Sequence, residues 1–180
     1  MMSVARKAAH IRALVLDVDG VLTDGSLTYA ARSEQRTFHV QDGLGIVLWQ
    51  QAGYRCALLT SKASAAVRRR AQHLHITDVF QNIREKLPVF HDFLKKYRLQ
   101  PAEVCYMGDD LLDLAVLQTA GLAITVPAAG AEVKAAADYV TQRGGGQGAA
   151  REAVELILKA QNRWTECIRR YASPVRELRP

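Results

Sequence analysis

The stretch LVLDVDGVLTDG, residues 14–25, decides the fold. The apolar run at residues 11–17 indicates a buried strand, because strands of a parallel sheet covered on both faces are apolar throughout. Asp17 and Asp19 follow where this strand ends, and side chains two apart in an extended chain point the same way. At about 5 Å and an effective dielectric of about 20, two carboxylates repel by roughly 3 kcal/mol, so a buried pair requires a cation or a shared proton.

The rest of the chain alternates strand-like and helix-like segments. Further apolar runs that indicate buried strands lie at residues 54–60, 103–108 and 122–126. Helix-like segments lie at residues 43–53, 64–74, 86–97 and 110–121, the last closed by Gly121 as a C-cap. This alternation predicts an α/β fold, a doubly wound, Rossmann-like parallel sheet with its functional site at the carboxyl ends of the strands.

Two segments depart from the alternation. Residues 26–40, SLTYAARSEQRTFHV, have short β-like runs on either side of a polar centre, and we expect a β-hairpin that projects from the sheet. No insertion is long enough to form a separate cap domain. Residues 144–148, GGGQG, precede a helix-like segment but lack the G-x-G-x-x-G spacing, so a hinge and a functional loop are both open.

Length and charge favour one domain with basic ends. A chain of 180 residues, 49% of them hydrophobic, fills one core. We predict a domain at residues 11–162 between a basic N-terminal arm, residues 1–10, and an Arg-rich C-terminal tail, residues 163–180. The net charge of +6 lies at the ends: three basic residues in the first twelve, and five arginines against two glutamates in the tail. The neutral middle does not indicate a nucleic-acid groove.

Membrane contact and disulfides are not indicated either. No apolar run reaches about 18 residues, and the beginning of the chain lacks the apolar segment of an export signal. The three cysteines are odd in number and widely spaced, which is typical of buried thiols in a reducing compartment. We therefore expect a cytoplasmic protein that does not bind membranes.

Polar residues also follow the other predicted strands. Thr60 and Ser61 end the second strand and Lys86 opens a helix, so a hydroxyl, backbone N–H groups and an ammonium are available to a phosphate. The third strand is followed by a group of acids: Asp109, Asp110 and Asp113. Carboxylates contributed by two strand ends suit a hard divalent cation, and Mg²⁺ with retained water fits one or two carboxylates plus a phosphate oxygen.

Four motifs in this order resemble those of the haloacid dehalogenase-like phosphatases: DVDGV, LLTS, Lys86 and GDDLLD. The longer matches DVDGVLTDG, VQDGLGI, GDDLLDL and GGGQGAARE resemble a branch of the family that has no cap domain. The resemblance implies a HAD-like fold. It also implies a homotetramer, in which the projecting hairpin covers a neighbouring active site.

The resemblance assigns roles to individual residues. Asp17 is implied to be the nucleophile and Asp19 the general acid and base, with Mg²⁺ held by the side chains of Asp17 and Asp109 and by the backbone carbonyl of Asp19. The further implied roles are phosphate binding by Thr60, Ser61 and Lys86, support of Lys86 and metal-bound water by Asp110 and Asp113, and substrate binding by Lys62, Arg70, Asp42 and Gly43.

The implied reaction is Mg²⁺-dependent hydrolysis of a sugar acid phosphate, 3-deoxy-D-manno-octulosonate 8-phosphate, through an aspartyl phosphate, in lipopolysaccharide precursor synthesis. Much of the branch has Gly and then a charged residue, often Arg, where this chain has Ser61 and Lys62, so a nine-carbon keto-deoxy sugar acid 9-phosphate is the alternative substrate. A phospho-receiver domain has its adjacent acids on the first strand, which disfavours that class. The intact acids and Lys86 disfavour a non-catalytic scaffold.

Overall fold

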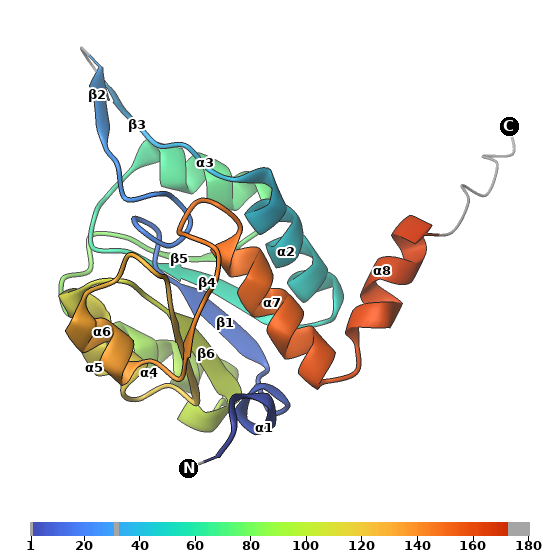
Figure 1. Ribbon diagram of the computed structural model, residues 1–180. Coiled ribbons are helices and arrows are strands. Elements are labelled where there is room, and N and C mark those ends of the chain that lie inside the picture. The colour runs from blue at the N-terminus through green and yellow to red at the C-terminus, as the bar shows by residue number, and fades with distance from the viewer. Residues whose placement is uncertain (1, 31–32, 173–180) are drawn as a thin grey trace, which may run out of the picture.

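The computed structural model describes residues 2–30 and 33–172 and shows a six-stranded parallel sheet covered by helices on both faces (Figure 1). The strand order is β5-β4-β1-β6-β7-β8. The strands are β1 (Ala13–Leu16), β4 (Arg55–Leu59), β5 (Asp78–Phe80), β6 (Val104–Met107), β7 (Leu122–Thr125) and β8 (Tyr139–Val140). The predicted doubly wound α/β fold is confirmed.

Strand β1 lies at the centre of the sheet, and all four of its residues are buried. Leu14 pairs in parallel with Cys56 of β4 on one side and with Cys105 of β6 on the other. From β1 the chain proceeds outward to β4 and β5, then returns to β6 and proceeds outward in the other direction. The carboxyl end of β1 is therefore the switch point of the sheet, where such folds form their crevice.

Helices cover the two faces of the sheet in separate layers. On one face α2 packs against α7, which also contacts α1, and Gln50 of α2 donates to the carbonyl of Leu74 at the end of α3. On the other face α5 contacts both α4 and α6. The helices are α1 (Val4–Ala8), α2 (Val40–Gln51), α3 (Ala65–His73), α4 (Lys86–Tyr97), α5 (Leu114–Leu117), α6 (Ala131–Ala136), α7 (Ala149–Ala160) and α8 (Trp164–Ala172).

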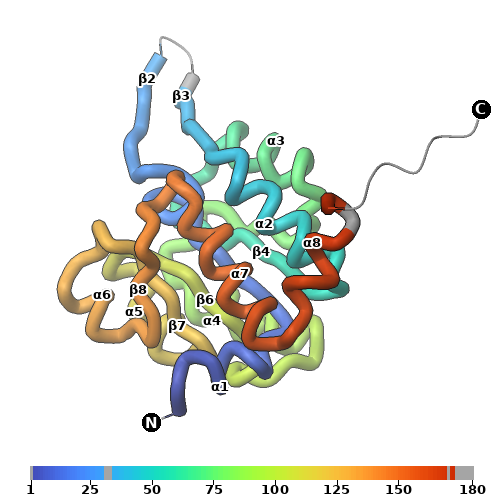
Figure 2. The backbone as a smooth tube through the Cα atoms, turned by 45° about the vertical axis from the view of Figure 1, so that its right-hand side comes forward, coloured from blue at the N-terminus to red at the C-terminus, as the bar shows by residue number. Residues whose placement is uncertain are grey.

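The predicted hairpin is present. Strands β2 (Thr28–Ala30) and β3 (Ser33–Gln35) pair antiparallel and project away from the sheet above its carboxyl edge (Figures 1 and 2). The tip, residues 31–32, lies outside the described residues. All three residues of β2 are exposed, so the hairpin obtains no burial from its own domain along this strand.

The segment predicted as a helix over residues 110–121 differs from that prediction. It forms a 3₁₀ turn, Leu111–Asp113, and then the short helix α5, whose C-cap is Gln118 and not Gly121. The carboxylate of Asp113 accepts hydrogen bonds from the backbone N–H groups of Asp109 and Asp110, which holds the first turn in this tighter form.

The ends of the chain also form helices. Ala8 of α1 is buried, and Lys7 donates to Asp138 at 2.6 Å, while α8 packs on α7. Residues 173–180 of the Arg-rich tail lie outside the described residues, and the division of the chain at residues 10 and 162 stays a prediction. Within the described part of the chain, no helix combines the length and apolar character needed to cross a bilayer.

Candidate active site

A polar cavity of about 220 Å³ opens at the carboxyl ends of β1, β4 and β6. It is lined by Asp17, Asp19, Gly25, Thr60, Ser61, Lys62, Lys86, Asp109, Asp110, Leu112 and Asp113. The fold thus brings together every residue predicted for catalysis, metal binding, phosphate binding and support, together with Lys62. These residues come from four separate segments, and the parallel direction of the strands is what places their ends at one edge.

Lys86 lies between two carboxylates at the bottom of this cavity. Its Nζ is 3.0 Å from Asp17 Oδ2 and 2.6 Å from Asp113 Oδ1, and only 1% of its side chain is exposed. Burial opposes the charged form of Lys86, but Asp17 and Asp113 outweigh this effect and raise its pKa. The ammonium therefore stays protonated and can attract an anionic phosphoryl group.

Asp113 is held by four hydrogen bonds. Its Oδ1 accepts from Lys86 and, at 2.5 Å, from the Tyr106 hydroxyl, and its Oδ2 accepts from the backbone N–H groups of Asp109 and Asp110 at 3.0 and 3.1 Å. A carboxylate has about four lone-pair sites, and all are occupied here. Asp113 is near enough to Asp17 and Asp109 to join a metal cluster, but its contacts are those of a residue that orients Lys86.

Asp17 and Asp109 have the properties of cation ligands. Burial, followed by the charge of Asp113, raises the pKa of both carboxyls to about 7. Among the described residues, Asp109 Oδ1 is buried without a hydrogen-bond partner, which is costly for a carboxylate oxygen. Oxygen donors alone, with room for water, suit Mg²⁺.

Thr60 is fixed by backbone contacts at the end of β4. Its N–H donates to the carbonyl of Phe80, and its carbonyl accepts from Ile83. The N–H of Lys62 donates to the Thr60 hydroxyl at 3.4 Å. Helix α3 begins at Ala65, close to the predicted start at residue 64, so the N–H groups near Thr60 belong to the loop before the helix.

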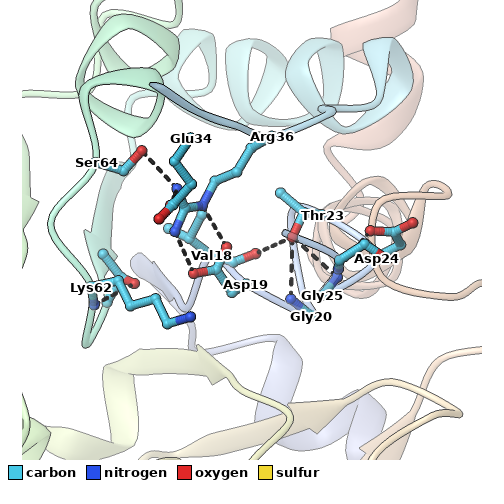
Figure 3. Close-up of polar contacts among 12 residues, drawn as sticks. Val18, Asp19, Gly20, Thr23, Asp24, Gly25, Glu34, Arg36, Lys62 and Ser64 are labelled. Carbon is cyan, nitrogen blue, oxygen red and sulfur yellow. Dashed lines mark hydrogen bonds and ion pairs between the residues drawn. The ribbon is translucent and has the colours of Figure 1, made fainter. Parts of the chain in front are cut away.

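Arg36, a residue that we did not predict, contacts Asp19 from the hairpin side. Its Nε and Nη2 donate to the two carboxylate oxygens of Asp19 at 2.7 and 3.0 Å (Figure 3). Its Nη1 donates to Ser64 Oγ at 2.8 Å and contacts Glu34 as well. No spacing rule connects Arg36 with Asp19, and the only signal was a basic residue in the hairpin.

The glycine-rich segment 144–148 packs against the loop that follows β1. A Cβ on Gly145 would lie 1.8 Å from the carbonyl oxygen of Gly20, and Gly146 donates its N–H to the carbonyl of Val21 at 3.0 Å. Gly20 itself has φ +89°, and a Cβ there would meet the carboxylate of Asp109. The segment therefore supports the loop that carries Asp19, as a close backbone contact and not as a free linker.

The remaining predicted residues lie elsewhere in this chain. The Asp42 carboxylate accepts hydrogen bonds from the backbone N–H groups of Gly148 and Arg151 at 3.1 and 2.9 Å, at the start of α7. Arg70 donates to the carbonyl of His39 and lines a separate cavity at the base of the hairpin, and Gly43 packs against its guanidinium. The structure does not bring these three residues to the catalytic cavity, and their role in substrate binding stays a prediction.

Known proteins resemble this chain over most of its length. Residues 55–151 match the family model of a haloacid dehalogenase-like hydrolase. The chain is 40% identical over 164 residues to the 3-deoxy-D-manno-octulosonate 8-phosphate phosphatase KdsC of Escherichia coli K12, covering 91% of this chain and 87% of the relative. The KdsC of Yersinia pestis is 38% identical over 161 residues, covering 89% and 86%.

Solved structures are equally similar. The phosphatase of the same name from Moraxella catarrhalis, in complex with magnesium, phosphate and KDO, superposes with a TM-score of 0.91 at 40% identity, covering 93% of this chain and 97% of that one. The cobalt-bound deoxy-D-mannose-octulosonate 8-phosphate phosphatase from Haemophilus influenzae has a TM-score of 0.84 at 39% identity, covering 87% and 92%.

Proposed function

Because the chain belongs to the haloacid dehalogenase-like hydrolases, in the branch of the 3-deoxy-D-manno-octulosonate 8-phosphate phosphatases, we propose that it hydrolyses 3-deoxy-D-manno-octulosonate 8-phosphate. The products are the free sugar acid and phosphate, so the protein is a phosphoric monoester hydrolase of lipopolysaccharide precursor synthesis. The observation that carries the proposal is the cavity in which Lys86 lies between Asp17 and Asp113, beside the Asp109 oxygen that has no hydrogen-bond partner in the described part of the chain.

Asp17 acts as the nucleophile in the proposed mechanism. The side chains of Asp17 and Asp109 and the backbone carbonyl of Asp19 would hold Mg²⁺, which would supply positive charge between the carboxylate and the phosphate. Lys86 and Thr60 hold the phosphoryl oxygens, with Ser61 beside them. A carboxylate oxygen of Asp17 then bonds to phosphorus as the bond to the sugar oxygen breaks, and an aspartyl phosphate forms.

Asp19 transfers the proton in both halves of the reaction. Its carboxyl first protonates the departing sugar oxygen, because an alkoxide is a poor leaving group. The resulting carboxylate next takes a proton from the water that attacks the aspartyl phosphate. Phosphate then leaves the site, the Asp17 carboxylate is restored, and Asp19 is again protonated.

The eight-carbon substrate is favoured over the nine-carbon alternative because the relatives described above carry the eight-carbon sugar acid in their names. Lys62 lines the cavity and can contact the sugar acid in this proposal. Arg70, in the adjoining cavity with Arg36 and His73, offers a planar fork for the carboxylate. Asp42 and Gly43 lie next to Arg70.

We also propose a cytoplasmic homotetramer in which the β2–β3 hairpin covers a neighbour's active site. The described chain has no cap domain, and hydrolysis through an aspartyl phosphate benefits from a covered site. Tyr29 of the hairpin is 74% exposed, and Leu111 and Leu112 beside the cavity are exposed as well. Apolar side chains of this size at both places suit a contact between copies.

Phosphate release from the eight-carbon substrate, with and without Mg²⁺, tests the proposal. We expect Mg²⁺-dependent turnover that Asp17→Asn lowers by at least about 10³-fold, because the variant lacks the nucleophile. Asp92→Asn is the matched control, since Asp92 is an exposed acid on α4. A higher kcat/KM on the nine-carbon substrate would overturn the substrate assignment, and a tenth of wild-type activity in Asp17→Asn would overturn the role of Asp17.

A further inference from the structure

We propose that Arg36, at the base of the hairpin, is a positioning residue that sets the orientation of the Asp19 carboxylate toward the leaving group. The inference rests on the proposed function, because it takes Asp19 as the proton donor to the sugar oxygen. It adds a residue outside the four motifs, and it connects the hairpin to the chemistry of the same chain.

The contact between the two side chains defines an orientation. Arg36 uses Nε and Nη2, the two donors on one edge of its planar guanidinium, on the two oxygens of Asp19 (Figure 3). A bidentate pair of this kind fixes the plane of the carboxylate as well as its distance. The fork occupies two of about four lone-pair sites, so Asp19, which lines the cavity, keeps sites for a proton.

The guanidinium is itself held in place. The side chain of Arg36 is fully covered, with 0% of its surface exposed. Its Nη1 is shared by Glu34 of β3 and by the hydroxyl of Ser64, the N-cap residue of α3, whose N–H in turn donates to Gln81. The orientation of Asp19 therefore depends, through Arg36, on the positions of the hairpin and of α3.

A purely structural ion pair between the hairpin and the β1 loop predicts a different behaviour. Loss of such a pair lowers stability or displaces the whole loop, and every substrate suffers equally. Loss of a group that orients Asp19 lowers activity most on a substrate whose leaving oxygen requires a proton. The sugar acid phosphate has an alkyl oxygen of this kind, whereas 4-nitrophenyl phosphate releases a phenolate that leaves without protonation.

The test compares kcat/KM of the Mg²⁺-loaded full chain on these two substrates for Arg36→Met, which keeps length and removes the fork. We expect the loss on the sugar acid phosphate to exceed the loss on 4-nitrophenyl phosphate by about tenfold or more, since misaligned proton transfer costs one to several orders of magnitude. Arg12→Met is the matched control, because Arg12 pairs with Glu103 at the other end of β1.

Asp19→Asn and the double variant separate this inference from the proposed function. If Asp19→Asn shows no leaving-group dependence, the proton-donor role of Asp19 fails, and with it the proposed mechanism. If it shows that dependence, Arg36→Met should add little to it, because the two residues act as one unit. Equal losses by Arg36→Met on both substrates, an equal loss in the Asp19→Asn background, or wild-type kinetics would each overturn the positioning role. Thermal unfolding of each variant reports whether it is folded.

Discussion

At the scale of single residues, the site compensates the charge repulsion between the two aspartates of DVDG, Asp17 and Asp19. Two carboxylates near the end of one strand repel each other, and the structure places a different cation beside each: Lys86, which Asp17 shares with Asp113, and Arg36 beside Asp19. The third carboxylate, Asp109, keeps a buried oxygen without a partner among the described residues. The site is thus incompletely neutralised, which is the condition under which a divalent ion binds.

This electrostatic state predicts how pH and Mg²⁺ act together on stability. Without metal, the folded-state pKa of Asp17 and Asp109 is raised from 3.8 to about 7, so the native state binds protons more tightly than the unfolded state. Their contribution to stability is present below about pH 4 and lost as pH rises toward about 7. Mg²⁺ requires the ionised carboxylates, so we expect it to raise the melting temperature more at pH 8 than at pH 5.

Differential scanning fluorimetry at constant ionic strength measures this effect. Asp109→Asn should abolish most of the Mg²⁺-induced shift at pH 8, because an amide is a weaker ligand and keeps no charge. Asp92→Asn, on the surface of α4, should leave the shift as it is in the wild type. The same Mg²⁺-induced shift at both pH values would show that the metal does not bind to these carboxylates.

At the scale of elements, the start of α7 connects the helix layer to the β1 loop. Asp42 of α2 accepts two N–H groups at the beginning of α7, and the preceding segment 144–148 contacts the backbone at Gly20. Helix N-termini leave N–H groups unsatisfied, and a buried carboxylate is a strong acceptor for them. The catalytic loop therefore depends on packing between α2 and α7.

Substitution of Gly145 tests this dependence. A Cβ in Gly145→Ala would meet the backbone carbonyl of Gly20 at 1.8 Å, so the loop must shift. We expect a loss of about 1–3 kcal/mol in the free energy of unfolding, from urea titration, together with a lower kcat. Gly130→Ala is the control, because a Cβ there meets nothing closer than 3.5 Å. Unchanged stability and kcat in Gly145→Ala would contradict the close contact.

Asp42→Asn distinguishes the two roles open to this residue. Asp42 is only 2% exposed. If its role is to accept hydrogen bonds at the start of α7, the substitution should lower the free energy of unfolding by about 1–3 kcal/mol and change KM little. If its role is to bind the substrate, the substitution should raise KM and leave the free energy of unfolding unchanged. Urea unfolding and steady-state kinetics on the same preparation decide between them.

At the scale of the whole molecule, the hairpin projects from the domain (Figure 2), on the side of the sheet edge that carries the cavity. If copies assemble through it, Tyr29→Asp should shift the protein from tetramer to smaller species in sedimentation velocity, because a charge replaces an exposed ring at the contact. Tyr29→Phe, which keeps the ring, should remain assembled. A wild-type chain that sediments as a monomer would exclude the tetramer.

Sequence alone determined the central strand, the four ordered motifs and most of the cavity, because each depends on residues adjacent in the chain. Apolar runs predict buried strands, and acids or hydroxyls directly after them reach the same sheet edge. The edge strands β5 and β8 were missed, since strands of three and two residues carry no periodicity and obtain their form by pairing with β4 and β7.

Only the tertiary structure decided the contacts between distant segments. Arg36 reaches Asp19 because the chain returning from the hairpin passes beside the β1 loop, and Asp42 reaches Gly148 across 106 positions because α2 packs on α7. Neither residue has a local pattern that names its partner. Hydrogen bonds and ion pairs require separations of about 3 Å, and for residues far apart in the chain it is the packing of whole elements that sets those separations.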